Sequence, residues 1–114
     1  MSSPVDIDNL NMLRELIGDD LKEILEAYLQ TAPTNLNKLE QATNNKDAEQ
    51  VRMQAHSLKG SSANIGANGL SSLSSELEQH GKNNNLEHAP NLLNQIKTEN
   101  TAVVDFLKSY IQQM

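Results

Sequence analysis

The chain has 114 residues, of which 37% are hydrophobic and 21% are charged. This composition suits one globular domain over residues 1–114 and leaves no room for a second. The absence of cysteine excludes disulfides, zinc–thiolate sites and cysteine nucleophiles. A net charge of −6 and an aromatic content of 3% argue against nucleic acid binding, because phosphate neutralisation and base stacking both lack suitable residues.

The distribution of apolar residues predicts an all-α fold. Apolar residues recur at helical spacing along almost the whole chain, and no alternating β-branched run occurs. No apolar stretch approaches the length needed to cross a bilayer, and the amino terminus does not resemble a signal peptide. We therefore expect a cytoplasmic protein without membrane contact.

The first two predicted helices meet at Gly18. The first is short, beginning at Asp6 or Asp8 as the N-cap and ending at Gly18. The second begins at Asp19, since carboxylates favour a helix N-terminus. Its apolar stripe continues past Pro33, which we expect to kink or split the helix. The apolar residues of the first helix are Ile7, Leu10, Leu13 and Ile17.

Three further helices follow a polar turn at residues 43–47. A fourth helix is expected after the glycine-rich turn at residues 66–69, and the sequence HGKNNN (residues 80–85) is expected to end it with its glycine and asparagines. The fifth begins near Leu86, tolerates Pro90 in its first turn and is expected to be the longest. The core side of the third helix is predicted to comprise Ala48, Val51, Ala55, Leu58 and Ile65, and that of the fourth Leu70, Leu73 and Leu77.

Four substantial amphipathic helices with short connections predict an antiparallel, up-and-down four-helix bundle. The short additional helix at the amino terminus is expected to cover one end of this bundle.

His56 is predicted to be exposed on the third helix. With about 100° of rotation per residue, it lies roughly 100° or more away from the buried side of that helix. The same exposed stripe contains Arg52, Lys59, Gly60 and Ala63.

Gly60 has two interpretations at this stage. A glycine inside a helix costs about 1 kcal/mol relative to alanine, so a compensating role is expected. It could leave room for a second protein to bring a reactive group against the His56 ring. It could instead be the residue that ends the helix, an interpretation of about equal weight before any resemblance is considered. Ile65 argues against a helix end, because it continues the apolar stripe beyond the glycine.

Two segments resemble the histidine-containing phosphotransfer (HPt) domain family. The sequence AHSLKGSSANIGANGLSSLSSELE (residues 55–78) resembles the signature around the family's histidine, and LRELIGDDLKEILEAYLQTAP (residues 13–33) is similar to its opening helices. The resemblance implies a multistep two-component phosphorelay, in which the histidine carries a phosphoryl group between receiver-domain aspartates. The implied partners are response-regulator receiver domains and an upstream hybrid histidine kinase.

The resemblance also implies roles for individual residues. His56 is the expected phosphoryl acceptor and donor, and Lys59 can disfavour the imidazolium and neutralise an added phosphoryl group. Glu78 occupies the position where relatives have a polar residue, often glutamine, that holds one ring nitrogen. It is expected to accept the Nδ1 proton and leave Nε2 as the nucleophile. Arg52 and Lys82 are candidate supporting cations, and Lys82 could equally form an ordinary helix-surface pair with Glu78.

The chain is expected to need no cofactor of its own and to be a monomer without autonomous kinase activity. It lacks a G-x-x-x-x-G-K loop, and the magnesium of phosphoryl transfer is expected on the partner receiver domain. Because the domain is acidic, an apolar patch beside His56, including exposed residues of the second helix, is expected to supply docking energy.

Two alternatives remain open. The chain could be a non-catalytic interaction bundle, or a phosphatase-assisting bundle or kinase fragment whose histidine is phosphorylated by an ATP-binding domain elsewhere. Methionines at both ends and five predicted helices favour a free-standing protein. His80 and His88 are interpreted as solvated surface residues, because their spacing does not match a helical metal site. The serine-rich run at residues 71–75 is interpreted as helix packing.

Overall fold

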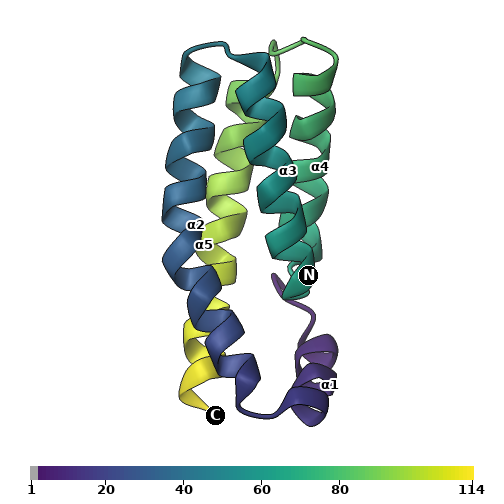
Figure 1. The fold of residues 1–114 in the computed structure, drawn as a ribbon, viewed down its shortest axis with the longest axis vertical. Coiled ribbons are helices and arrows are strands. Elements are labelled where there is room, and N and C mark those ends of the chain that lie inside the picture. Colours follow the sequence, from purple (N-terminus) through teal and green to yellow (C-terminus); the bar gives the residue numbers. More distant parts are fainter. Residues whose placement is uncertain (1–2) are drawn as a thin grey trace.

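The computed structural model describes residues 3–114, and all regular secondary structure in that range is helical. This confirms the predicted all-α fold (Figure 1). The helices are α1 (Ile7–Ile17), α2 (Asp20–Asn44), α3 (Ala48–Asn64), α4 (Asn68–Lys82) and α5 (Ala89–Gln112). No helix within residues 3–114 has the length and apolar character required to span a membrane.

Helices α2 to α5 form an antiparallel bundle in which successive helices run up and down (Figure 1). Each of them packs against the next in the chain, and α5 closes the bundle against α2. The contact between α3 and α4 is the most extensive. The predicted up-and-down arrangement is therefore confirmed.

Helix α1 lies at one end of the bundle, beyond the ends of α3 and α4 (Figure 1). The side chain of Asp6 caps it by accepting a hydrogen bond from the Asn9 N–H, and Gly18 ends it with a φ of +61°. The Asp6 N–H donates to the carbonyl of Gly66 in the turn between α3 and α4, and the Tyr110 hydroxyl donates to Asn11 Oδ1 at 3.0 Å. These contacts hold α1 over the end of the bundle, as predicted.

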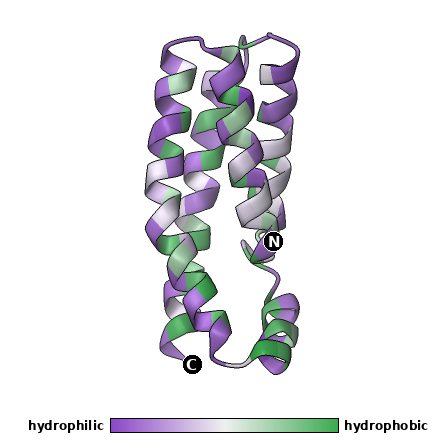
Figure 2. Cartoon of the chain, viewed as in Figure 1, coloured by the Kyte–Doolittle hydropathy of each residue, from purple (hydrophilic) through white to green (hydrophobic). Residues whose placement is uncertain are grey.

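The apolar stripe of α1 is only partly buried. Leu10 is fully buried and Leu13 is half-buried. Ile7 and Ile17 are exposed, so these two residues of the predicted apolar stripe lie outside the core. Figure 2 shows that this short helix at the bundle end carries several hydrophobic residues.

Helix α2 continues through Pro33, so the predicted split is wrong; a kink stays a prediction. Pro33 cannot donate a backbone hydrogen bond, but it lies on the exposed side of α2, where water can satisfy the carbonyl left without a partner. Because it is unbroken, α2 has 25 residues against 24 in α5. The expectation that the fifth helix is the longest is therefore also wrong.

The predicted end of α4 is confirmed for its asparagines, which follow the helix, and is wrong for its glycine. Gly81 is buried inside the helix, where an added Cβ would lie 2.7 Å from the Arg52 backbone nitrogen and 2.9 Å from the Ala48 carbonyl oxygen. The helix ends one residue later, and Asn84 adopts the positive φ of +54° in the following turn. Gly81 thus permits close packing of α4 on α3, and an asparagine makes the turn.

The core consists of apolar side chains from all five helices together with a buried polar pair. The predicted core residues Val51, Ala55, Leu58 and Ile65 are buried, whereas Ala48 and Leu73 are half-buried. The Tyr28 hydroxyl donates a 2.7 Å hydrogen bond to Asn100 Oδ1, which links α2 to α5. Burial raises the pKa of Tyr28 well above its usual value. The Tyr28 phenol is therefore a neutral hydrogen-bond donor that fixes the relative position of two helices.

Candidate functional site

His56 lies in the middle of α3, which Asp47 caps by accepting a hydrogen bond from the Gln50 N–H. The helix continues past Gly60 as far as Asn64, so the interpretation of Gly60 as a helix end is wrong. The hydroxyls of Ser61 and Ser62 donate to the Leu58 carbonyl, at 3.2 Å and 2.6 Å. These hydrogen bonds keep the hydroxyl groups satisfied within a stretch of low helix propensity.

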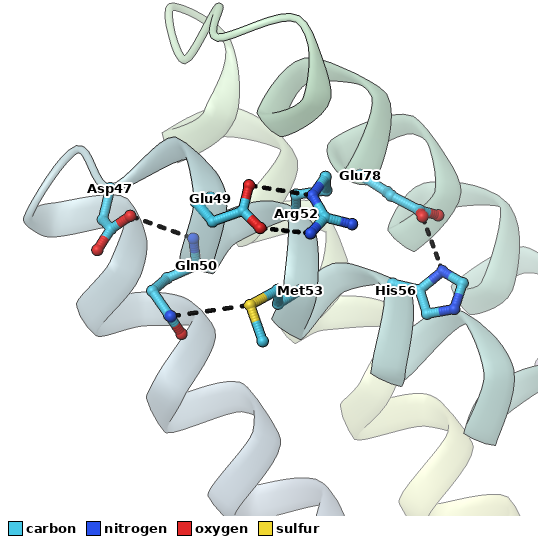
Figure 3. Close-up of polar contacts among 7 residues, drawn as sticks. All are labelled: Asp47, Glu49, Gln50, Arg52, Met53, His56 and Glu78. Carbon is cyan, nitrogen blue, oxygen red and sulfur yellow. Dashed lines mark hydrogen bonds and ion pairs between the residues drawn. The ribbon is translucent and has the colours of Figure 1, made fainter.

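The His56 side chain is 64% exposed, and its Nδ1 lies 2.7 Å from Glu78 Oε2. Figure 3 shows the ring directed at Glu78 through this nitrogen, while the other nitrogen points away from the side chains drawn. A carboxylate oxygen can only accept, so this contact selects the tautomer in which Nδ1 carries the proton. The lone pair of Nε2 is then left free on the exposed side of the ring.

Glu78 joins α4 to two residues of α3. Its side chain is only 12% exposed, and its Oε1 lies 2.6 Å from Lys59 Nζ. At this distance the Lys59 ammonium is both the opposite charge and the hydrogen-bond donor that faces the buried Oε1. Lys59 and, more weakly, His56 hold the pKa of Glu78 below its usual value, against the opposing effect of burial. Glu78 is therefore an anion that holds His56 and Lys59 at the same time.

The surface of α3 beside the ring is open. A Cβ built on Gly60 would meet no atom within 4 Å, and Ala63, one turn further on, is exposed. Of the residues predicted on this stripe, these two leave space. Lys59 is half-buried, and its ammonium group lies beside Glu78.

The structure does not bring Arg52 or Lys82 to the imidazole. The Arg52 guanidinium pairs with Glu49 and is drawn toward it in Figure 3, with Nε at 3.3 Å from Glu49 Oε2. Lys82 is exposed at the end of α4 and forms no ion pair with residues 3–114. The carboxylate expected to attract it, that of Glu78, is paired with Lys59 instead.

Ser71 contributes to the site and was not identified from the sequence. Its hydroxyl, on α4, donates a 3.1 Å hydrogen bond to the Lys59 carbonyl on α3, to which Ser62 also donates at 3.1 Å. The pair of hydrogen bonds holds the turn of α3 that follows the histidine. The serine-rich run of α4 indicated close packing, but which of its serines reaches α3 depends on how α4 is rotated against that helix.

No group of three or more potential metal ligands occurs among residues 3–114. The contacts around His56 provide one nucleophilic nitrogen, one anion that orients it, one cation and an open approach. This arrangement suits a group carried on nitrogen and transferred to or from a second protein.

Comparisons with known proteins agree with this chemistry. A model of the Hpt domain family matches residues 23–106. The structure of histidine-containing phosphotransfer protein B (HptB) from Pseudomonas aeruginosa PAO1 is 30% identical, with a TM-score of 0.94 over 100% of this chain and 99% of that one. The HPT domain of a sensor hybrid histidine kinase from Shewanella, 20% identical, shares the fold with a TM-score of 0.85 over 98% of this chain and 97% of that one.

A relative in sequence is the phosphorelay intermediate protein rdeA of Dictyostelium discoideum. It is 28% identical over 88 residues, which cover 77% of this chain and 35% of rdeA. This chain therefore matches only about a third of that protein's length.

Proposed function

The chain belongs to the Hpt domain family, and on this premise we propose that His56 accepts a phosphoryl group from an aspartyl phosphate of one receiver domain and donates it to an aspartate of another. Histidine phosphotransfer within a phosphorelay is the role of the family and of this chain. The observation that carries the assignment to His56 is the exposed imidazole whose Nδ1 is held 2.7 Å from a carboxylate.

In the transfer step the Nε2 lone pair attacks the phosphorus atom and the bond from phosphorus to the aspartyl oxygen breaks. The aspartate leaves as a carboxylate, and no proton has to move before attack because Nε2 is already unprotonated. The phosphorylated ring retains the Nδ1 proton and carries a positive charge, which the Glu78 anion stabilises from 2.7 Å away. Transfer to the second receiver is the reverse of this step.

Lys59 supports the charge that arrives with the phosphoryl group. It lies one turn after His56 on the same side of α3, and in the resting structure it is held by Glu78. Its ammonium is a donor that phosphoryl oxygens attract strongly. We assign Gly60 and Ala63 to clearance for the incoming receiver, and we retain Arg52 and Lys82 as supporting cations only at the rim of the docked complex.

The receiver supplies the rest of the chemistry. Its magnesium ion and carboxylates are expected to stabilise the charge of the transferred group, so this chain acts as a carrier rather than as an autonomous kinase. We propose that it does so as a monomer. Docking relies on apolar surface, because the net charge of −6 gives no long-range attraction to an acidic partner. Two exposed side chains suit this role, namely Met53 one turn before His56 and Ile24 on α2.

The test is transfer from a receiver domain labelled with radioactive phosphate on its aspartate. The wild-type chain is expected to become labelled at residue 56, with the acid-labile and alkali-stable behaviour of a phosphoramidate. His56→Gln is expected to take up no label while keeping the helical circular dichroism and unfolding midpoint of the wild type, since the side chain is exposed. Labelling of His56→Gln at the wild-type rate would overturn the proposal.

A further inference from the structure

We propose that His80 and His88 form a two-histidine site for a divalent transition metal ion at the end of the bundle where α4 connects to α5. The two residues are eight positions apart, yet their ring centroids lie 6.0 Å apart with an angle of 65° between the ring planes. The sequence alone indicates two separate surface residues. Their proximity arises from the loop between the two helices.

The backbone holds both residues in place before any ion binds. The His80 carbonyl, in the last turn of α4, accepts a hydrogen bond from the Asn85 N–H at 2.9 Å. The His88 carbonyl, which precedes α5, accepts one from the Leu92 N–H at 3.0 Å. The loop between them turns at Asn84, whose φ is +54°. The two imidazoles are thus presented by an ordered turn rather than by a flexible segment.

The distance between the rings fits a shared ion. Zinc–nitrogen bonds of about 2.0–2.1 Å at a tetrahedral angle place the centroids of two imidazoles bound to one ion about 5 Å apart. The observed 6.0 Å is about 1 Å longer, a difference that rotation of the exposed His88 side chain can close. Neither ring forms a side-chain hydrogen bond with residues 3–114, and rotation of either ring presents its other nitrogen. Both rings therefore remain available as ligands.

The surroundings determine which ions this pair can hold. His88 is exposed and His80 is half-buried, so water can complete the coordination sphere. Two neutral imidazoles favour zinc, nickel and copper over magnesium or calcium, which prefer oxygen ligands. A bound ion would connect the last turn of α4 to the start of α5 and would stabilise the folded chain, because the unfolded chain does not hold the two rings together.

The test is titration of the full chain with zinc chloride, followed by NMR of the histidine ring protons and by thermal unfolding. The ring signals of His80 and His88 are expected to shift together to saturation at one ion per chain, and the unfolding midpoint is expected to rise. Magnesium chloride at the same concentration is expected to cause neither change.

Single variants separate chelation from binding at one ring. His80→Gln and His88→Gln are each expected to lose at least about tenfold in zinc affinity, because the second imidazole otherwise acts at high effective concentration. His56→Gln is the matched control and is expected to bind zinc as the wild type does. A smaller loss in either His80→Gln or His88→Gln, or a loss in His56→Gln instead, would overturn the proposal.

Discussion

Two helical glycines on facing helices, Gly60 of α3 and Gly81 of α4, have opposite surroundings. A Cβ on Gly60 would meet nothing within 4 Å, whereas a Cβ on Gly81 would lie 2.7 Å from the Arg52 backbone nitrogen. Each costs its helix about 1 kcal/mol relative to alanine. The compensation differs: close helix packing at Gly81, and open space beside His56 at Gly60.

The close helix packing at Gly81 helps to position the side chains of the site beside Gly60. Gly81 lies one turn after Glu78 on α4, against the turn of α3 that precedes His56. Close approach of the two backbones there brings Glu78 within reach of both His56 and Lys59. The comparison shows that the geometry of an exposed site can depend on close backbone packing one turn away along the same helices.

The largest expected effect is that of Gly81→Ala on stability. The new Cβ would meet backbone atoms of Arg52 and Ala48, which cannot move independently of α3. Overpacking costs about 1–3 kcal/mol, and contacts with backbone atoms place this variant at about 3 kcal/mol, of which about 1 kcal/mol returns as helix propensity. Urea unfolding is expected to show a net loss of about 2 kcal/mol. A variant as stable as the wild type would show that α3 and α4 can move apart freely.

Gly60→Ala is expected to have the opposite profile. Because the methyl group meets no atom of the chain, stability should rise by up to about 1 kcal/mol through helix propensity. Phosphoryl transfer from a labelled receiver should slow by about tenfold, since the methyl group lies where the receiver approaches; this corresponds to about 1.4 kcal/mol. Unchanged transfer with raised stability would mean that the open space is not used by the partner.

The smallest effect concerns the pH dependence of Glu78. Its pKa is lowered in the folded chain by Lys59 and His56, so its contribution to stability is present above the usual value of 4.5 and is lost as pH falls below it. Glu78→Gln should therefore lose less stability than the wild type between about pH 6 and pH 3, by less than about 1 kcal/mol. Urea unfolding at several pH values measures the difference. If the free energy of unfolding changed with pH in the same way for both proteins, the ion pair that Glu78 forms with Lys59 and His56 would be contradicted.

Local patterns predicted much of the fold and the centre of the site. Asp6 and Gly18 delimit α1 through capping chemistry that depends only on adjacent residues. The exposure of His56 follows from its angle to Val51 and Leu58 on one helix. Predictions that needed the environment of a residue were less successful, as with Pro33, whose effect depends on the exposure of one face of α2.

The sequence by itself determined the helices, their apolar sides and the side of α3 on which His56 lies, because helical periodicity is a property of neighbouring residues. Only the tertiary structure decided the role of Gly81, the contact of Ser71 with the Lys59 carbonyl and the meeting of His80 with His88. These features depend on the register and rotation of one helix against another. Both are settled by the packing of the whole core, to which each helix contributes one side.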